Sequence, residues 1–475
     1  MKVAFSKIKI TPKGMIGKPM AGYSRPDYCK GILDDIYAYG VLIEDIVLGN
    51  IKKKLLLISL DLLKIPLVVS DYIKEKIKDD FYSLGPGQIL IHATHTHSAP
   101  DITGEFYWPG SVVNVVKGIM FGANRNDRYI VWMTRQIVKM VGDLFNNLKP
   151  CKMAWTKEKF NPDIVINRRH PTQKPMPDLG VITFKGLEEN KLIGFIINYS
   201  CHPTSLSFAN NKLSADYPGR VVHRINELSN DEVNVIFFTG PAGDLNPITT
   251  CGTNYKYLDK NRTPVYRQMG VYEHTKKVGY TIADEAYKLA QSIPEDNYFE
   301  DMEFESYLKT IWVPMKDHKY FSKTWFVNKL LYVLKKYLVL KVALAHDEDP
   351  NFPGLAIKHR GNKINGYTVL QYIKIKASSK SKEKKKEFSI LTVPGELFIS
   401  IGEILKKKSP TGEDDTFIFQ NSNDWIAYLF PLKEYVEQGG YEPIASFAPL
   451  CGDYVTKEML KLFKEAKEKI TFSHS

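Results

Sequence analysis

The feature that most constrains the fold is a repeated unit, a short apolar run followed directly by small and polar residues. Apolar runs of four to eight residues that are bounded by turn residues predict buried strands. Three such runs are 88–91, 192–198 and 233–239, which lead into His92-Ala93-Thr94-His95, Cys201-His202-Pro203 and Gly240-Pro241-Ala242-Gly243. Polar groups at strand ends assemble the site in many α/β proteins, so we expect one site at one edge of a sheet.

Helical patterns separate the expected strands, at 67–80, 127–147 and 272–292. Strands that alternate with helices predict an α/β protein with a mixed β-sheet core covered by helices. No linker rich in Pro or Ser interrupts the chain, so residues 1–475 are expected to form a single catalytic domain. Three segments look inserted into it, 106–122, 321–345 and 378–387, and the last (SSKSKEKKKE) is expected to be a solvated hairpin tip.

Composition excludes several classes of protein. Hydrophobic residues make up 44% and charged residues 25% of the 475 residues, which excludes a disordered or coiled-coil chain. The 65 basic and 53 acidic residues give a net charge of +12, too small for this length to indicate a nucleic-acid partner.

Five dispersed cysteines without a CxxC pair argue against a disulfide framework and indicate a reducing compartment. The N-terminus alternates apolar and polar residues as a strand does and has no signal-peptide core. The longest apolar stretch, 326–345, contains four lysines and cannot span a bilayer. A cytoplasmic location follows as an expectation.

The strongest local signal is the pair His95 and His97 at the end of an expected strand. Residues two apart in an extended chain point to the same face, so both imidazoles can face one site. Catalytic zinc sites use three protein ligands and one open position, and imidazole is a preferred ligand. The alternative is a pair of histidines that are satisfied by hydrogen bonds within a loop.

Four further signals are weak when taken singly. His202-Pro203-Thr204 and Val393-Pro394-Gly395-Glu396 each follow an apolar strand, and the glutamate could simply be the first-turn acid of a helix. The segment 423–428 ends in Tyr428, and a tyrosine is usually a packing residue. The glycine-rich turn 239–247 can hold an anion or an oxyanion through backbone N–H groups, or can be only a tight turn.

The order of these motifs is more specific than any one of them, because together they resemble the neutral/alkaline (non-lysosomal) ceramidase family. The matching pieces run in family order from near the N-terminus to about residue 442: Met20-Ala21-Gly22-Tyr23, Ala93-Thr94-His95-Thr96-His97-Ser98, Asn167-Arg168, His202-Pro203-Thr204, Ala215-Asp216-Tyr217-Pro218-Gly219, Gly243-Asp244-Leu245-Asn246-Pro247, Pro394-Gly395-Glu396, Ala427-Tyr428 and Gly440-Tyr441-Glu442.

The resemblance implies one zinc ion held by His95, His202, Glu396 and Tyr428. It implies catalytic roles around the attacking water for His97, Arg168 and Tyr441. Supporting roles behind the ligands or at an oxyanion are expected for Asp216, Gly243, Asp244 and Asn246.

The chain departs from the family pattern at three points. Asn246 stands where the family has a serine, which removes a serine nucleophile from consideration. The spacing from Tyr428 to Tyr441 is one residue longer than in the family. The family's C-terminal immunoglobulin-like domain is expected to be absent, since little chain follows the last motif.

The sequence thus predicts a zinc-dependent hydrolase that cleaves an N-acyl amide bond, such as that of ceramide or a related N-acyl lipid. The alternatives are a zinc hydrolase of a different amide or ester, and a non-catalytic lipid-binding protein on the same scaffold. The apolar residues of 106–121 could wall or cover an acyl chain, or form a buried helix. The basic stretch 329–341 could rest on an anionic membrane, or be a helix with a solvated face.

Overall fold

The computed structural model describes residues 1–23, 25, 27–45, 53–104, 106, 126–249, 271–314, 357–360, 363–381, 383–438, 442, 446 and 450–472. Of the segment 106–122 that looks inserted in the sequence, only Phe106 is among these residues, and the segment 321–345 lies outside them. In the described part, no helix is long and apolar enough to cross a membrane.

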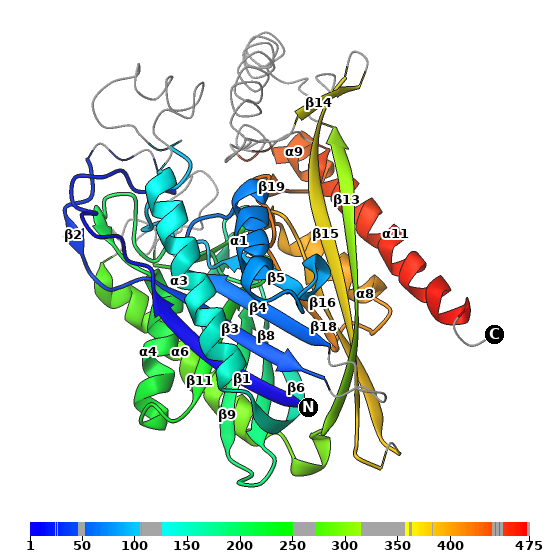
Figure 1. Ribbon diagram of the computed structural model, residues 1–475. Coiled ribbons are helices and arrows are strands. Elements are labelled where there is room, and N and C mark those ends of the chain that lie inside the picture. The colour runs from blue at the N-terminus through cyan, green and yellow to red at the C-terminus, as the bar shows by residue number, and fades with distance from the viewer. Residues whose placement is uncertain are drawn as a thin grey trace.

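A sheet of eight strands forms the first half of the molecule (Figure 1). Its order is β11 (Asn234–Thr239), β9 (Leu192–Tyr199), β8 (Asp178–Gly186), β6 (Lys149–Lys159), β1 (Lys2–Lys9), β3 (Tyr37–Glu44), β4 (Lys54–Leu60) and β5 (Ile89–Ala93). The outermost pairs, β11 with β9 and β4 with β5, are parallel, and the other pairs are antiparallel. The expected mixed sheet is confirmed.

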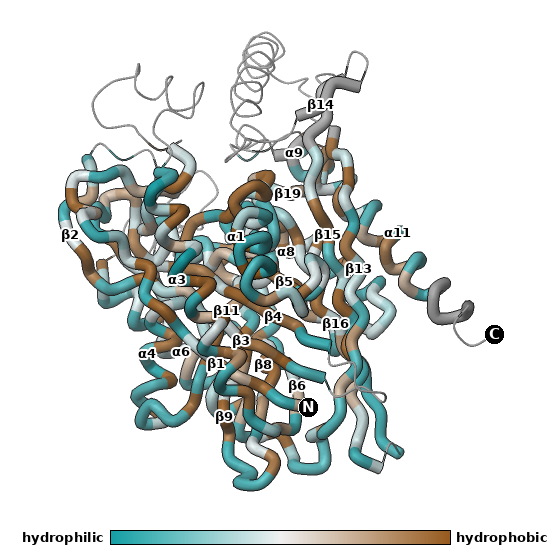
Figure 2. Tube along the Cα trace, in the orientation of Figure 1, coloured by the Kyte–Doolittle hydropathy of each residue, from teal (hydrophilic) through white to brown (hydrophobic). Residues whose placement is uncertain are grey.

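The two halves of this sheet meet along a narrow junction. β1 pairs with β6 through Lys2 and Val3, and β11 contacts β3, β4 and β5 from the opposite half. The hydroxyl of Ser59 on β4 donates to the Phe237 carbonyl on β11 at 2.7 Å. The two halves therefore share one apolar core, and the ends of β5 and β11 come together. Figure 2 shows how hydrophobic the strands of this region are compared with the loops at the lower end.

Four long helices cover the sheet, and three of them lie at or near the positions that the periodicity predicts, whereas α4 was not predicted. Their bounds are α1 (Leu67–Asp80), α3 (Asp127–Asn146), α4 (Asp216–Ser229) and α6 (Tyr272–Ser292). α3 packs on β1 and β3, while α4 and α6 pack together against β11, β8 and β9. Pro66 precedes α1, and the Asn126 side chain accepts from the Tyr129 N–H at the start of α3.

A second sheet lies beside the first and carries the C-terminal motifs. It consists of β13 (Asp301–Pro314), β15 (Lys363–Ser378), β16 (Lys385–Thr392) and β18 (Thr416–Phe419), with β14 (Ile357–Arg360) paired to β15. α8 (Ile399–Lys408) and α11 (Cys451–Phe472) pack with it. The amide of Asn198 on β9 donates to the carbonyl of Ile418 on β18 at 3.0 Å, which joins the two sheets.

The expected hairpin at 378–387 is present, but its tip is shorter than predicted. β15 and β16 pair as far as Ser378 and Lys385, so that only 379–384 connect them. Lys385 and Lys386 belong to the strand, because an exposed strand position accepts a charged side chain as readily as a loop does.

Short elements complete the fold. They are β2 (Gly31–Ile32) with β10 (Lys212–Leu213), β7 (Val165–Asn167) with β12 (Leu245–Pro247), β17 (Glu396–Leu397) with β19 (Tyr428–Leu429), α9 (Leu432–Gln438), and 3-10 turns at Pro86–Gln88 and Glu295–Asn297. The described cysteines, Cys29, Cys151, Cys201 and Cys451, are buried free thiols.

Candidate metal centre

Strand ends from both sheets converge on one buried region. Backbone hydrogen bonds hold them together: the Gln420 N–H donates to the Thr239 carbonyl at 3.0 Å, and the Asn423 N–H donates to the Ile91 carbonyl. The strand β17, which contains Glu396, pairs in parallel with β19, which contains Tyr428. Four predicted ligands that are scattered over more than three hundred residues of sequence therefore reach the same place.

His95 follows β5 and is held by the backbone of the segment after β4. Its N–H donates to the Leu62 carbonyl, and its Nδ1 lies 2.5 Å from the Leu63 carbonyl oxygen. Its φ is 74°, in the left-handed region that non-glycine residues rarely adopt. Such strain persists where the surrounding structure enforces it, and it is common at functional sites.

His202 follows β9 and is oriented by the glycine-rich turn. Its Nδ1 lies 2.9 Å from the Ala242 carbonyl oxygen. A carbonyl oxygen can only accept, so the Nδ1 atoms of both His95 and His202 carry the proton. The Nε2 atoms of both rings therefore present lone pairs. Burial, followed by the neighbouring His95, lowers the pKa of His202 to about 3.

Glu396 faces both of these histidines. Its Oε2 is 3.3 Å from His95 Nε2 and 3.5 Å from His202 Nε2. Oε1 accepts a hydrogen bond from Trp425 Nε1 at 3.2 Å, whereas Oε2 is buried and receives none from the described residues. Burial alone would raise the pKa of this carboxyl, but the histidines and a hydrogen bond from Tyr428 lower it to about 2.

His97 completes the cluster. Its Nε2 lies 3.3 Å from His95 Nε2 and 3.2 Å from His202 Nε2, and its ring is buried. Gly22 packs against the ring, and a Cβ at Gly22 would lie 2.6 Å from the ring atoms. Arg25 donates to the His97 carbonyl at 2.5 Å. Burial, then the two neighbouring histidines, lowers the pKa of His97 well below its usual value.

These groups fit a metal ion. His95, His97 and His202 offer nitrogens that lie within 4.8 Å of one another, so the cluster could hold a metal. Glu396 Oε2 has no hydrogen-bond partner among the described residues and faces the Nε2 atoms of His95 and His202, so a cation at this point could be bound by all three atoms. Ligand atoms about 2.0–2.2 Å from a tetrahedral ion stand roughly 3.3–3.6 Å apart, and Glu396 Oε2 lies 3.3 and 3.5 Å from the two histidine nitrogens.

Arg168 lies beside the cluster, and buried side chains hold it. Its Nη1 donates to Asn246 Oδ1 at 2.8 Å, and its Nη2 lies 3.1 Å from Glu442 Oε1. Its guanidinium carbon is 5.4 Å from the centre of the Tyr428 ring. Glu442 also pairs with Arg169 at 3.1 Å, and Arg169 pairs with Glu434 on α9 at the same distance.

The other predicted supporting residues lie behind the ligands. The carboxylate of Asp216 accepts from the N–H groups of Ser205 and Leu206, in the loop after His202. Asp244 accepts from the amide of Asn167 and from the first N–H of α8. Burial raises the pKa of both Asp216 and Asp244 to about 6.

Gly243 is the point at which the glycine-rich turn touches the glutamate segment. Its N–H donates to the Leu397 carbonyl at 2.7 Å, and a Cβ would lie 2.4 Å from the Glu396 carbonyl oxygen. The absent side chain therefore lets the two backbones approach. Tyr441, the third residue expected to be catalytic, lies outside the described residues.

Sequence reasoning gave no role to Trp425, Glu442, Arg25 and Lys64, which contact site residues or their neighbours. Trp425 and Glu442 lie within motifs recognised in the sequence, but the sequence does not show which side chains they contact. Lys64 was signalled only as a lone charge in the apolar segment that follows β4.

Comparisons with known proteins rest on structure alone, because no family model and no curated protein sequence matches the chain. The neutral ceramidase from Pseudomonas aeruginosa superposes with a TM-score of 0.71 at 16% identity, over 98% of this chain and 74% of that one. The chain has the neutral ceramidase fold. A ceramidase complexed with C2 superposes over 98% of this chain and 75% of that one, with a TM-score of 0.70 at 17% identity. The resemblance seen in the sequence motifs is thus confirmed at the level of the ceramidase fold.

Proposed function

We propose that the protein is a zinc-dependent hydrolase that cleaves the amide bond of ceramide or a related N-acyl lipid. The observation that carries this proposal is that Glu396 Oε2, which accepts no hydrogen bond from the described residues, lies 3.3 Å from His95 Nε2 and 3.5 Å from His202 Nε2. The fold shared with ceramidases supports the choice of reaction.

His95, His202, Glu396 and Tyr428 would hold the ion. Zinc in such a site acts as a Lewis acid and brings the pKa of a water ligand to about 7. The protein keeps both histidines in the tautomer that a ligand needs, through the carbonyls of Leu63 and Ala242. Trp425 holds Oε1 of the glutamate, which leaves Oε2 directed at the histidines.

His97 is the acid and base in this proposal. Its Nε2 faces the point where the ligand atoms meet, within reach of a water molecule bound there. It takes a proton from water as the water oxygen bonds to the carbonyl carbon. It returns that proton to the nitrogen as the C–N bond breaks, which yields a fatty acid and an amine.

Arg168 would stabilise the negative charge that develops on the carbonyl oxygen. Asn246 and Glu442 hold its guanidinium in place from two sides. Asn246, which replaces the family's serine, thus has a role that needs no nucleophile. Tyr441 is proposed as a second donor to the same oxygen, on the resemblance of its motif.

A metal analysis combined with a substrate panel tests this function. The expected result is one zinc ion per chain and release of fatty acid from ceramides and other long-chain N-acyl amides. Zinc with turnover of short polar amides or esters only would favour the alternative hydrolase. A protein without zinc or turnover would be the non-catalytic lipid-binding alternative and would contradict the proposal.

Chain-length dependence tests the lipid substrate separately. If the apolar residues that follow His97 contact an acyl chain, each buried CH₂ removed from the substrate should cost about 0.8 kcal/mol in kcat/KM. An unmodified enzyme that is indifferent to chain length would contradict the choice of lipid. Membrane contact through 329–341 and a cytoplasmic location stay predictions, because no described residue bears on them.

A further inference from the structure

Lys64 is a buried cation next to the proposed metal site. Its residue is 3% exposed, and its Nζ lies 4.1 Å from the centre of the Trp425 ring and 5.7 Å from that of Phe106. A lysine is almost never fully buried without a compensating interaction. Stacking on aromatic faces supplies one, and the attraction is strongest for tryptophan in a desolvated setting.

Trp425 connects this cation to the carboxylate of Glu396. Its indole Nε1 donates to Glu396 Oε1 at 3.2 Å. Asp424 fixes the backbone beside the ring, since its Oδ1 accepts from the N–H groups of Trp425 and of Leu67. The indole is thus held between an ammonium on its face and a carboxylate at its N–H edge.

The segment that carries Lys64 also holds a second proposed ligand. The Leu63 carbonyl is the acceptor for His95 Nδ1, and the Leu62 carbonyl accepts from the His95 backbone. Leu63 therefore contacts the proposed ligand His95 through its carbonyl. The next residue, Lys64, is connected to the proposed ligand Glu396 through the indole of Trp425. A shift of this short segment would move both ligands together.

We propose that Lys64 is a positioning residue for the metal site, which acts on Glu396 through the indole of Trp425. A cation on the face of an indole draws electron density from the ring and strengthens the N–H as a donor. The stronger bond to Oε1 holds the carboxylate with Oε2 toward His95 and His202. This proposal rests on the metal site of the proposed function and adds a residue to it.

Zinc affinity, measured by competition with a chelator, tests this role. Lys64→Met keeps the length and removes the charge, and Trp425→Phe keeps an aromatic ring and removes the N–H. Each should weaken zinc binding by about 10- to 100-fold, the usual effect of removing a group behind a ligand. Lys64→Gln should match Lys64→Met, while Lys64→Arg should retain most of the affinity.

The double variant Lys64→Met/Trp425→Phe separates action through the indole from independent effects. If Lys64 acts through Trp425, the double variant should bind zinc no more weakly than Trp425→Phe alone. The matched control is Lys157→Met, which removes a partly buried lysine whose Nζ lies 4.5 Å from the centre of the Phe417 ring and donates to the Glu413 and Thr416 carbonyls instead of contacting a ligand. It should leave zinc affinity unchanged even where stability falls.

Two results would overturn the proposal. One is unchanged zinc affinity in Lys64→Met or Lys64→Gln while Trp425→Phe loses it. The other is multiplicative losses in the double variant. An unmodified protein that binds zinc but hydrolyses no N-acyl amide would contradict the proposed function, and the affinity series would still support Lys64. An unmodified protein that binds no zinc would overturn both.

Discussion

The two sides of the site hold their functional side chains by different means. On the ligand side, His95 and His202 are oriented by the backbone carbonyls of Leu63 and Ala242. On the arginine side, Arg168 is oriented by the side chains of Asn246 and Glu442. Backbone at strand ends is fixed by the sheet, whereas the arginine side depends on buried charges from separate segments.

This difference separates metal binding from stability. Removing a ligand histidine takes away a donor but leaves no buried charge behind. Removing Glu442 takes away the negative charge that two buried arginines share, which is costly in a protein interior. We therefore expect losses of zinc on one side and losses of folding free energy on the other.

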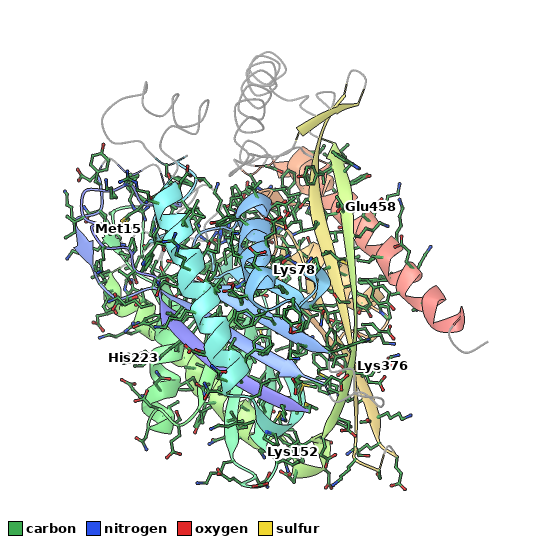
Figure 3. All side chains as sticks on the ribbon, in the orientation of Figure 1. Met15, Lys78, Lys152, His223, Lys376 and Glu458 are labelled. Carbon is green, nitrogen blue, oxygen red and sulfur yellow. The ribbon has the colours of Figure 1, made fainter. Side chains whose placement is uncertain are left out.

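The largest effect is expected from His95→Ala and His202→Ala. Each should abolish hydrolysis and release most of the zinc, because each ring supplies one lone pair to the site. Metal content after dialysis and fatty-acid release measure the two effects. His223→Ala is the control, since that ring lies on α4 with its side chain 47% exposed (Figure 3). Full zinc content in either site variant would contradict the assignment of that histidine as a zinc ligand.

His97→Ala should lower kcat by about 10²–10⁴-fold and largely retain the zinc, as expected of an acid and base that does not bind the ion. The same two measurements apply. His97 Nε2 lies as close to the other two nitrogens as a ligand would, so this variant also decides its role. Zinc loss equal to that of His95→Ala would make His97 a ligand.

On the arginine side, Glu442→Gln should destabilise the protein by about 3–5 kcal/mol while zinc content is unchanged. The substitution keeps the size of the side chain but removes the charge shared by Arg168 and Arg169. Denaturant unfolding measures the free energy. Glu227→Gln, which breaks an ion pair with side chains 31% and 43% exposed, should cost far less, because solvent screens an exposed pair. Equal costs for the two variants would contradict the account of this side.

The smallest effect is expected from Gly243→Ala, which tests the backbone argument on the ligand side. The added Cβ would lie 2.4 Å from the Glu396 carbonyl oxygen and must displace that backbone. Overpacking should cost about 1–3 kcal/mol, and the shift of Glu396 should weaken zinc binding by about tenfold. Gly186→Ala, whose Cβ meets nothing closer than 3.9 Å, should change neither quantity. Unchanged zinc affinity in Gly243→Ala would show that the ligand side tolerates backbone displacement.

Local features of the fold could be read from the sequence because they depend on periodicity and capping. The helices α1 and α6 begin and end where the apolar spacing predicts. The antiparallel order of strands within the eight-stranded sheet could not be predicted from the sequence, because strand pairing is set by contacts between distant segments.

The site divides in the same way. Histidines at strand ends can be recognised from the sequence, and the residues expected to bind zinc do lie together. The groups that orient these ligands cannot be recognised in the sequence, because any residue type can supply a backbone carbonyl such as that of Leu63. Trp425 and Lys64 act on the site only after three segments fold together, so no local pattern marks them.

The most direct test of the account is anomalous diffraction at the zinc absorption edge from crystals of the unmodified protein. We expect one strong peak within about 2.0–2.2 Å of His95 Nε2, His202 Nε2 and Glu396 Oε2. A crystal grown with zinc that shows no peak among these atoms, or shows its strong peak elsewhere, would contradict it.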